Sequence, residues 1–131
     1  MIVALIPCGE TDWGAAGRLL GRVELPLSPA GEARCAAWAR DLAPLGLERI
    51  VHGPDELVTR TATTLAEHLG VATRALSGLQ EVDLGLWAGL TECELKHRFA
   101  TAHRELREAP LNVQPPGGEA LRAARARVDE C

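Results

Sequence analysis

Apolar and polar positions along the chain form two kinds of pattern. Residues 2–6 are continuously apolar, which is typical of a strand buried on both faces of a sheet. Short segments at residues 49–51 and 73–76 are predicted to be two more strands. Between them, apolar residues recur at helical spacing. A strand-helix-strand-helix-strand order predicts a parallel sheet with right-handed crossovers.

The helix boundaries are marked by capping residues. Ser28 and Pro29 predict a helix start, and that helix should end before Pro44, with Cys35, Trp38 and Leu42 on its buried face. A second helix is predicted from Asp55 to Leu69, closed by Gly70.

The second half of the chain predicts only helices and loops. Thr91 and Glu94 have capping-box spacing, and the helix that they open should run to Pro110. Its expected buried stripe is Leu95, Phe99, Ala102 and Leu106. A last helix should open near Glu119. We therefore expect a single domain over residues 1–131, of the α/β class, with three α/β/α layers around a mostly parallel sheet.

Composition excludes several classes of function. A net charge of −4 gives no electrostatic basis for binding nucleic acid or an anionic membrane, and no apolar run is long enough to span a bilayer. The four cysteines lack CxxC or Cys/His metal-site spacing. We expect no metal and no other cofactor. The start of the chain lacks the pattern of a secretory leader, which favours a cytoplasmic protein.

Candidate chemistry lies where the predicted strands end. Pro7 and Cys8 follow the first strand, and His52 and Gly53 follow the second. Ligands of open α/β sheets bind beyond the carboxyl ends of the strands. These residues should therefore face a pocket.

Six motifs in order make the chain resemble the histidine phosphatase superfamily, also called phosphoglycerate mutase-like. That family opens with Arg-His-Gly-Glu-Thr-x-Trp-Asn, and this chain has PCGETDWG from Pro7 to Gly14. The later matches are GRLLG from Gly17, ELPLSPAGE from Glu24, the Thr61–Ala62 pair, LQEVDLGLWAGL from Leu79 and PPGGEAL from Pro115. The resemblance covers essentially the whole chain and implies the phosphoglycerate mutase-like fold.

The resemblance also implies a phosphate pocket, most of which is substituted here. Cys8 stands at the position of the family's nucleophilic His, Pro7 and Leu57 at its two Arg, and Glu81 at its acid. The second catalytic His would lie beyond Cys131. The positions assigned to this pocket are Pro7, Cys8, Gly9, Gly14, Gly21, Leu57 and Glu81. Phosphoryl transfer requires concentrated positive charge, so the resemblance implies a catalytically degenerate member, or pseudoenzyme.

Two interpretations of the remaining groups stay open. Cys8 is either a replacement nucleophile with His52 as its base and Glu81 as the acid, or a small buried residue beside a surface His52. In the first case the chain is a hydrolase or mutase for a phosphorylated small molecule. Arg60, one helical turn after Leu57, either reaches into the emptied arginine position or stays on the helix flank.

The resemblance implies one more strand and helix than this sequence contains. Without them, we expect an unpaired sheet edge and an uncovered apolar face. Three explanations are open: a fragment of a longer protein, a second copy or another protein over the edge, or a repacked last helix. The preferred interpretation is a binding or assembly module that forms a homodimer or binds a protein partner.

Overall fold

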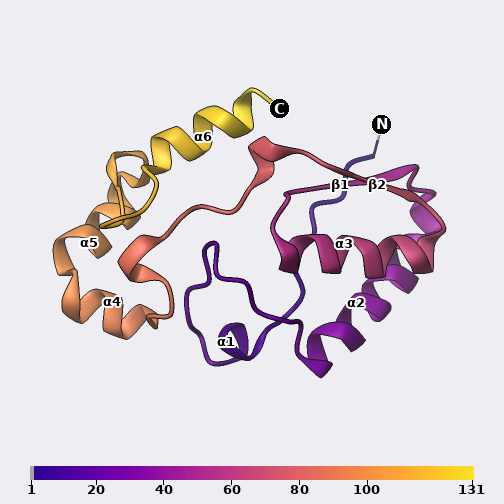
Figure 1. The fold of residues 1–131 in the computed structure, drawn as a ribbon, viewed down its shortest axis with the longest axis horizontal. Coiled ribbons are helices and arrows are strands. Elements are labelled where there is room, and N and C mark those ends of the chain that lie inside the picture. The colour runs from indigo at the N-terminus through magenta and orange to yellow at the C-terminus, as the bar shows by residue number, and fades with distance from the viewer. Residues whose placement is uncertain (1) are drawn as a thin grey trace. The chain divides into compact units, whose positions relative to one another are not determined.

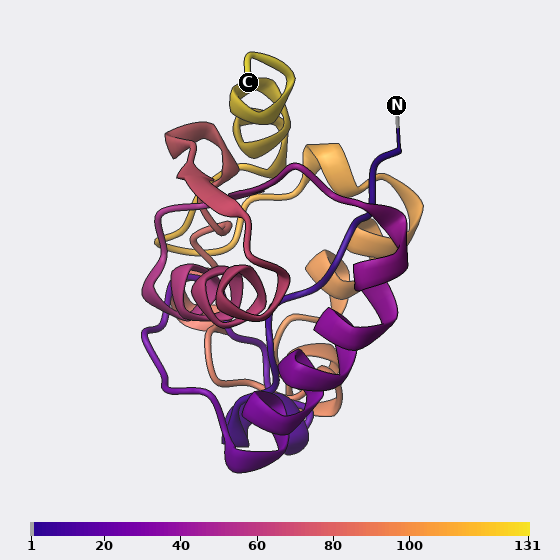
Figure 2. The ribbon, with the colours of Figure 1, turned by 90° about the vertical axis from the view of Figure 1, so that its right-hand side faces the viewer.

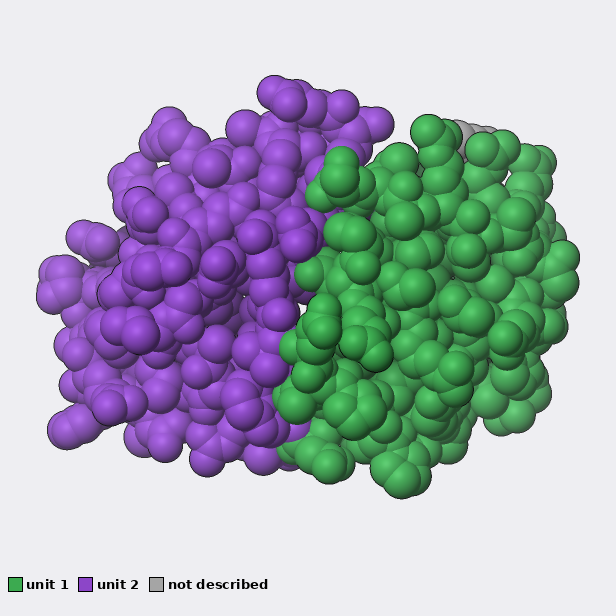
Figure 3. All heavy atoms as spheres, in the orientation of Figure 1, with its two compact units in different colours: residues 1–12, 24–77 green, residues 13–23, 78–131 purple. Residues whose placement is uncertain are grey.

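The computed structural model describes residues 2–131, which form two compact units (Figure 3). Unit 1 contains the residues up to Asp12 together with Glu24–Ser77, and unit 2 contains Trp13–Val23 and Gly78–Cys131. The chain therefore passes from one unit to the other three times. That residues 1–131 act as a single domain stays a prediction.

Unit 1 contains the sheet. Strands β1 (Arg49–His52) and β2 (Ala72–Ala75) pair in parallel, with Arg49 opposite Ala72 and His52 opposite Ala75. The connection between them is helix α3 (Glu56–Leu69), which packs on β1 and on helix α2 (Pro29–Leu42) (Figures 1 and 2). The predicted α/β class with a parallel sheet is confirmed, as are the strands at 49–51 and 73–76.

The helix ends of unit 1 follow the sequence signals. The Ser28 hydroxyl accepts a hydrogen bond from the Gly31 N–H at 3.0 Å, and Pro29 is the first residue of α2. The helix ends at Leu42, before a 3-10 turn (Ala43–Leu45) that contains Pro44. Helix α3 ends at Gly70, whose φ of 68° is the left-handed conformation expected after a helix. These boundaries are confirmed.

The predicted strand at residues 2–6 is wrong. The segment has no regular secondary structure and is not part of the sheet. Three of its five side chains are exposed, with Ile2 64%, Val3 67% and Leu5 93% exposed, and Ala4 and Ile6 are half-buried. An apolar run becomes a buried strand only when neighbouring strands supply a hydrogen-bond ladder. The two-stranded sheet of the described residues does not pair with this segment.

Unit 2 is helical, with its core around Trp87. Its helices are α4 (Glu92–Arg98), α5 (Ala100–Glu108) and α6 (Leu121–Asp129), with 3-10 turns at Gly85–Trp87 and Pro110–Asn112. A further 3-10 turn, Ser77–Leu79, crosses the boundary between the units. The buried core residues of unit 2 are Trp87, Leu90, Leu95 and Val113.

The single helix predicted from Thr91 to Pro110 is broken. The capping box of Thr91 and Glu94 is confirmed, with both reciprocal hydrogen bonds present. At Phe99 the backbone leaves helical geometry (φ −132°, ψ 49°), and α5 begins at the next residue. The Phe99 ring centroid lies 6.1 Å from that of Trp87, at a tilt of 58°. Packing of Phe99 on the core thus accompanies the break.

The last helix begins two residues later than predicted. The Glu119 N–H donates to the Asp83 carbonyl at 2.8 Å, so this residue belongs to a loop-to-loop contact before α6 opens at Leu121. Helix α1 (Asp12–Ala15) leads into the loop that covers the rest of residues 13–23. That loop is held inside unit 2 by a pair of bonds between Leu19 and residues 89–90, at 2.8 and 2.9 Å. No helix among residues 2–131 is long and apolar enough to cross a membrane.

Candidate functional site

The turn after residues 2–6 is held in unit 1 by a buried hydrogen-bond relay. The Gly9 N–H donates to Thr61 Oγ1 at 3.0 Å, and the Thr61 hydroxyl donates to the Leu57 carbonyl at 2.9 Å. A Cβ at Gly9 would lie 2.4 Å from Leu27 Cδ2 and 3.0 Å from Cys35 Sγ, so a larger residue would require the Leu27 side chain to move. Two predicted site positions, Gly9 and Leu57, are therefore joined through one threonine.

The start of α2 locks the other side of this turn. The Ser28 N–H donates to the Glu10 carbonyl at 2.9 Å. Gly31, in the first turn of α2, approaches so closely that an added Cβ would lie 2.2 Å from the Glu10 carbonyl oxygen. The turn and the helix start form one rigid backbone assembly. The backbone that directly follows Cys8 is therefore held in place by these contacts.

The Cys35 thiol beside this turn has an unfavourable environment for ionisation. Cys8 is half-buried, and Cys35, against Gly9, is fully buried. Burial raises the pKa of the Cys35 thiol, and the negative charges of Glu32 and of an ionised Cys8 raise it further. Burial therefore disfavours the thiolate form of Cys35.

His52 is a buried residue at the end of β1. It is 8% exposed, so its interpretation as a surface residue is wrong. Its Nδ1 lies 2.6 Å from the Gly53 carbonyl oxygen, which only accepts, so Nδ1 carries the proton. This tautomer leaves Nε2 as the basic nitrogen. The pairing of His52 with Cys8 stays a prediction.

Neither arginine position of the implied pocket carries charge. Pro7 is exposed, and Leu57 is 7% exposed in the first turn of α3. Arg60, considered as a replacement, donates instead to Glu32 from Nε and Nη2, both at 3.3 Å. Its side chain is 60% exposed. This agrees with the helix-flank interpretation of Arg60.

The other three predicted positions, Gly14, Gly21 and Glu81, belong to unit 2. Gly14 is exposed in α1, and its carbonyl accepts from Gly17 at 3.0 Å. Gly21 has a φ of 62°, and a Cβ there would lie 3.1 Å from the Val82 carbonyl. Glu81 is exposed, and its backbone carbonyl accepts from Arg22 Nε at 2.7 Å. In unit 2, Gly21 and Glu81 therefore lie on two loops in contact.

A charged cluster centred on Glu119 was not predicted. Arg127 binds both oxygens of Glu119, at 2.7 and 2.9 Å, and donates to the Gly78 carbonyl at 2.7 Å. Arg22 lies 3.2 Å from Glu119. The Arg127 hydrogen bond holds the pKa of the Glu119 carboxyl below its usual value, with the charges of both arginines assisting. The available signal was Glu119 itself, inside the PPGGEAL motif.

Unit 2 should lose stability in acid through Glu119. Because folding lowers the pKa of Glu119, the unfolded chain binds the proton more tightly than the folded chain. The stabilisation that ionised Glu119 gives to the folded state is therefore complete above the unfolded pKa of 4.5 and is lost as the pH falls through the folded pKa. Urea unfolding at about pH 7 and about pH 3.5 measures it. Between these two pH values, the free energy of unfolding should fall less for Glu119→Gln than for the wild type. Glu105→Gln, an exposed site on α5, is the control and should fall as the wild type does.

Known proteins resemble this chain along nearly its whole length. The sequence profile of the histidine phosphatase superfamily (branch 1) matches residues 3–131. Phosphoserine phosphatase 1 of Hydrogenobacter thermophilus is 27% identical over 124 residues, which are 95% of this chain. Probable phosphoglycerate mutase GpmB of Salmonella paratyphi B is 28% identical over 126 residues, or 96% of this chain. The chain spans 59% of the length of each of these two relatives.

Solved structures give the same coverage. One described as mycobacterial hydrolase 1 superposes with a TM-score of 0.82 at 29% identity, covering 94% of this chain and 59% of that one. A mycobacterial glucosyl-3-phosphoglycerate phosphatase, solved with VO3, gives a TM-score of 0.81 at 30% identity and covers 92% and 57%. Together with the sequence matches, they confirm the phosphoglycerate mutase-like fold, of which this chain forms a part.

Proposed function

The chain belongs to the histidine phosphatase superfamily (branch 1), and from that premise we propose that it is a catalytically degenerate member that works as a binding or assembly module. The observation that carries the proposal is Leu57. It stands at the position where the resemblance implies a phosphate-binding arginine, and its aliphatic side chain is only 7% exposed. It cannot hold a phosphoryl oxygen.

The charge around the turn supports the same proposal. Losing one preorganised electrostatic donor costs about 3 kcal/mol of transition-state stabilisation. Here Pro7 and Leu57 replace two such donors. The turn glycines and helix caps of the family are retained in this chain. The positive charge that phosphoryl transfer needs is not.

A hydrolase that uses Cys8 and His52 is the second candidate. The observation that favours it is the tautomer of His52, whose Nδ1 bond to Gly53 leaves Nε2 free to accept a proton. The substrate would be a phosphorylated small molecule. Against it stand the uncharged residues Pro7 and Leu57 at the two arginine positions.

A panel of phosphomonoesters, assayed with purified wild type and Cys8→Ala, separates the two. We expect neither protein to turn over any ester above the uncatalysed rate. Cys93→Ala, which removes an exposed thiol of α4, is the matched control for thiol loss. Turnover by the wild type and by Cys93→Ala but not by Cys8→Ala would establish a thiol enzyme and overturn the proposal.

For the assembly role, we propose that a second copy or a protein partner covers two apolar surfaces. These are the segment at residues 2–6 and Val51, which is 43% exposed. Sedimentation of the same preparations tests the homodimer. A monomer at all concentrations examined would remove the second copy from this proposal.

A further inference from the structure

A hollow of about 390 Å³ opens in unit 1 along one face of α3. Glu56, Thr59, Arg60 and Thr63 line it at the helical spacing that puts them on a single face. Its opposite wall is the loop Leu25–Leu27, and Glu32 of α2 closes one side. We call this feature the α3 hollow. Its volume is within the range of small-molecule sites.

The apolar part of the α3 hollow is made by leucines. Leu25 and Leu27 come from the loop and Leu57 from α3. Leu57 is nearly fully buried and Leu25 and Leu27 are half-buried, so the floor is held rigidly by the core of unit 1. An apolar group of a ligand can pack on these leucines without desolvating polar groups of the protein.

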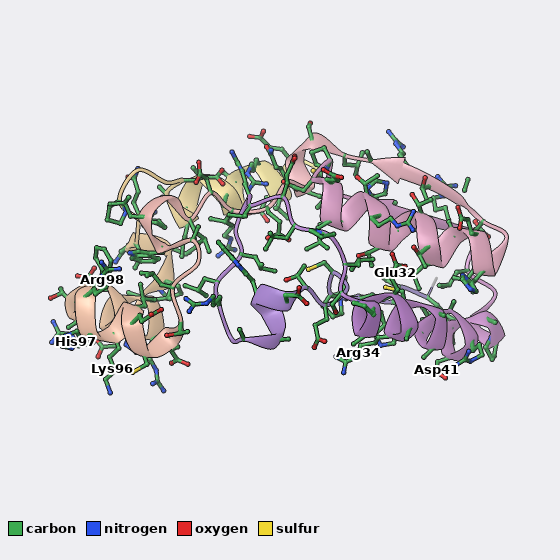
Figure 4. All side chains as sticks on the ribbon, turned by 60° about the horizontal axis from the view of Figure 1, so that its bottom comes forward. Glu32, Arg34, Asp41, Lys96, His97 and Arg98 are labelled. Carbon is green, nitrogen blue, oxygen red and sulfur yellow. The ribbon has the colours of Figure 1, made fainter. Side chains whose placement is uncertain are left out.

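The charged groups of the α3 hollow sum to one negative charge. Arg60 and Glu32 are 3.3 Å apart and neutralise each other. In Figure 4 Glu32 lies on the side of α2 toward α3, whereas Arg34 and Asp41 point away from it. Glu56 takes part in none of the ion pairs formed by residues 2–131. Its carboxylate is therefore not paired with a cationic side chain of the described residues.

We propose that the α3 hollow binds a small organic cation, with its ammonium or guanidinium group against the carboxylate of Glu56 and its apolar body on the leucine floor. The inference rests on the proposed binding role and names the class of ligand. The hydroxyls of Thr59 and Thr63 line the same face and offer further acceptors to the N–H groups of such a cation.

An anion is disfavoured in the same place. The one cationic side chain among the residues that line the hollow is Arg60, and its guanidinium already donates twice to Glu32. An anion would have to separate that pair and would meet the carboxylate of Glu56. The first turn of α3 does not offset this, because Glu56 itself occupies it.

Titration with phenethylammonium, beside phenylacetate as a probe of similar size and opposite charge, tests the inference. Chemical-shift changes in the purified chain should saturate with phenethylammonium and should centre on α3 and residues 25–27. Glu56→Gln should weaken binding about five-fold, the loss expected from roughly 1 kcal/mol of charge attraction. Glu67→Gln, an exposed site on the same helix outside the hollow, is the control and should bind as the wild type does.

Three results would overturn it: no saturation with phenethylammonium, tighter binding of phenylacetate, or equal binding by Glu56→Gln and Glu67→Gln. Glu56 is exposed, so its replacement should leave the fold intact, which far-UV circular dichroism checks. Phosphomonoester turnover is read on the same preparations. Failed titration without turnover rejects the ligand class alone, whereas turnover that requires Cys8 rejects the proposed function.

Discussion

Replacing Trp87 by alanine should lower the free energy of unfolding of unit 2 by about 3–5 kcal/mol, the usual cost of emptying a buried tryptophan site. Trp87 is 1% exposed at the centre of the unit 2 core and packs against Phe99. No smaller side chain can refill the space without moving α4 or α5. Urea unfolding followed by circular dichroism measures the loss.

Two further variants make this prediction specific. Leu86→Ala changes the adjacent residue, which is 68% exposed, and should cost less than about 1 kcal/mol. Trp87→Phe keeps an aromatic ring and removes an indole N–H that has no hydrogen-bond partner among the described residues. Because a buried unpaired donor costs about 1–3 kcal/mol, this variant should lose much less than Trp87→Ala. Equal losses for Trp87→Ala and Leu86→Ala would contradict the assigned core.

Replacing Gly31 by alanine should destabilise unit 1 by about 3 kcal/mol, the upper end of the usual cost of overpacking. The new Cβ would lie 2.2 Å from the Glu10 carbonyl oxygen, and both partners are backbone held by hydrogen bonds. The better helix propensity of alanine returns only up to about 1 kcal/mol. Thermal and urea unfolding measure the net effect.

Gly46→Ala is the matched control for this substitution. Gly46 has a φ of 60°, but nothing lies within 4 Å of an added Cβ. It should therefore lose only about 1–2 kcal/mol, from backbone strain alone. If Gly31→Ala is no worse than Gly46→Ala, the close approach of α2 to the turn is wrong.

Local signals correctly predicted several helix boundaries of this chain, for a physical reason. Ser28, Pro29, Gly70 and the Thr91–Glu94 capping box act on backbone groups within a few residues of themselves. The hydrogen bonds by which they begin or end a helix lie within one helical turn. The sequence therefore contained all the information needed for those boundaries.

The errors came from residues whose state depends on distant partners. Residues 2–6 have the composition of a buried strand, but a strand needs a ladder, and the described sheet does not supply one. Phe99 fits a continuous helical stripe, yet the position of Trp87 decides where its ring packs. Neither outcome can be read from a local pattern.

The candidate site shows the same division. The motifs around Gly9, Gly21 and Glu81 could be located from the sequence, because turn glycines and loop motifs recur at fixed spacing. The contact of Arg22 with Glu119 and the α3 hollow could not be located in this way. Each joins segments that are far apart in the sequence, as with Arg22 and Glu119 or Leu25 and Arg60.

The alternation of the chain between its two units has a consequence for synthesis. Residues 13–23 leave the ribosome before most of unit 1, yet Leu19 bonds to residues 89–90, which are made much later. At about 5–20 residues per second, completing residues 24–90 takes on the order of 3–13 s. During that interval the loop is a nascent segment without its partners. A chaperone or protease that meets the growing chain should find it there, between two stretches that already belong to the first unit.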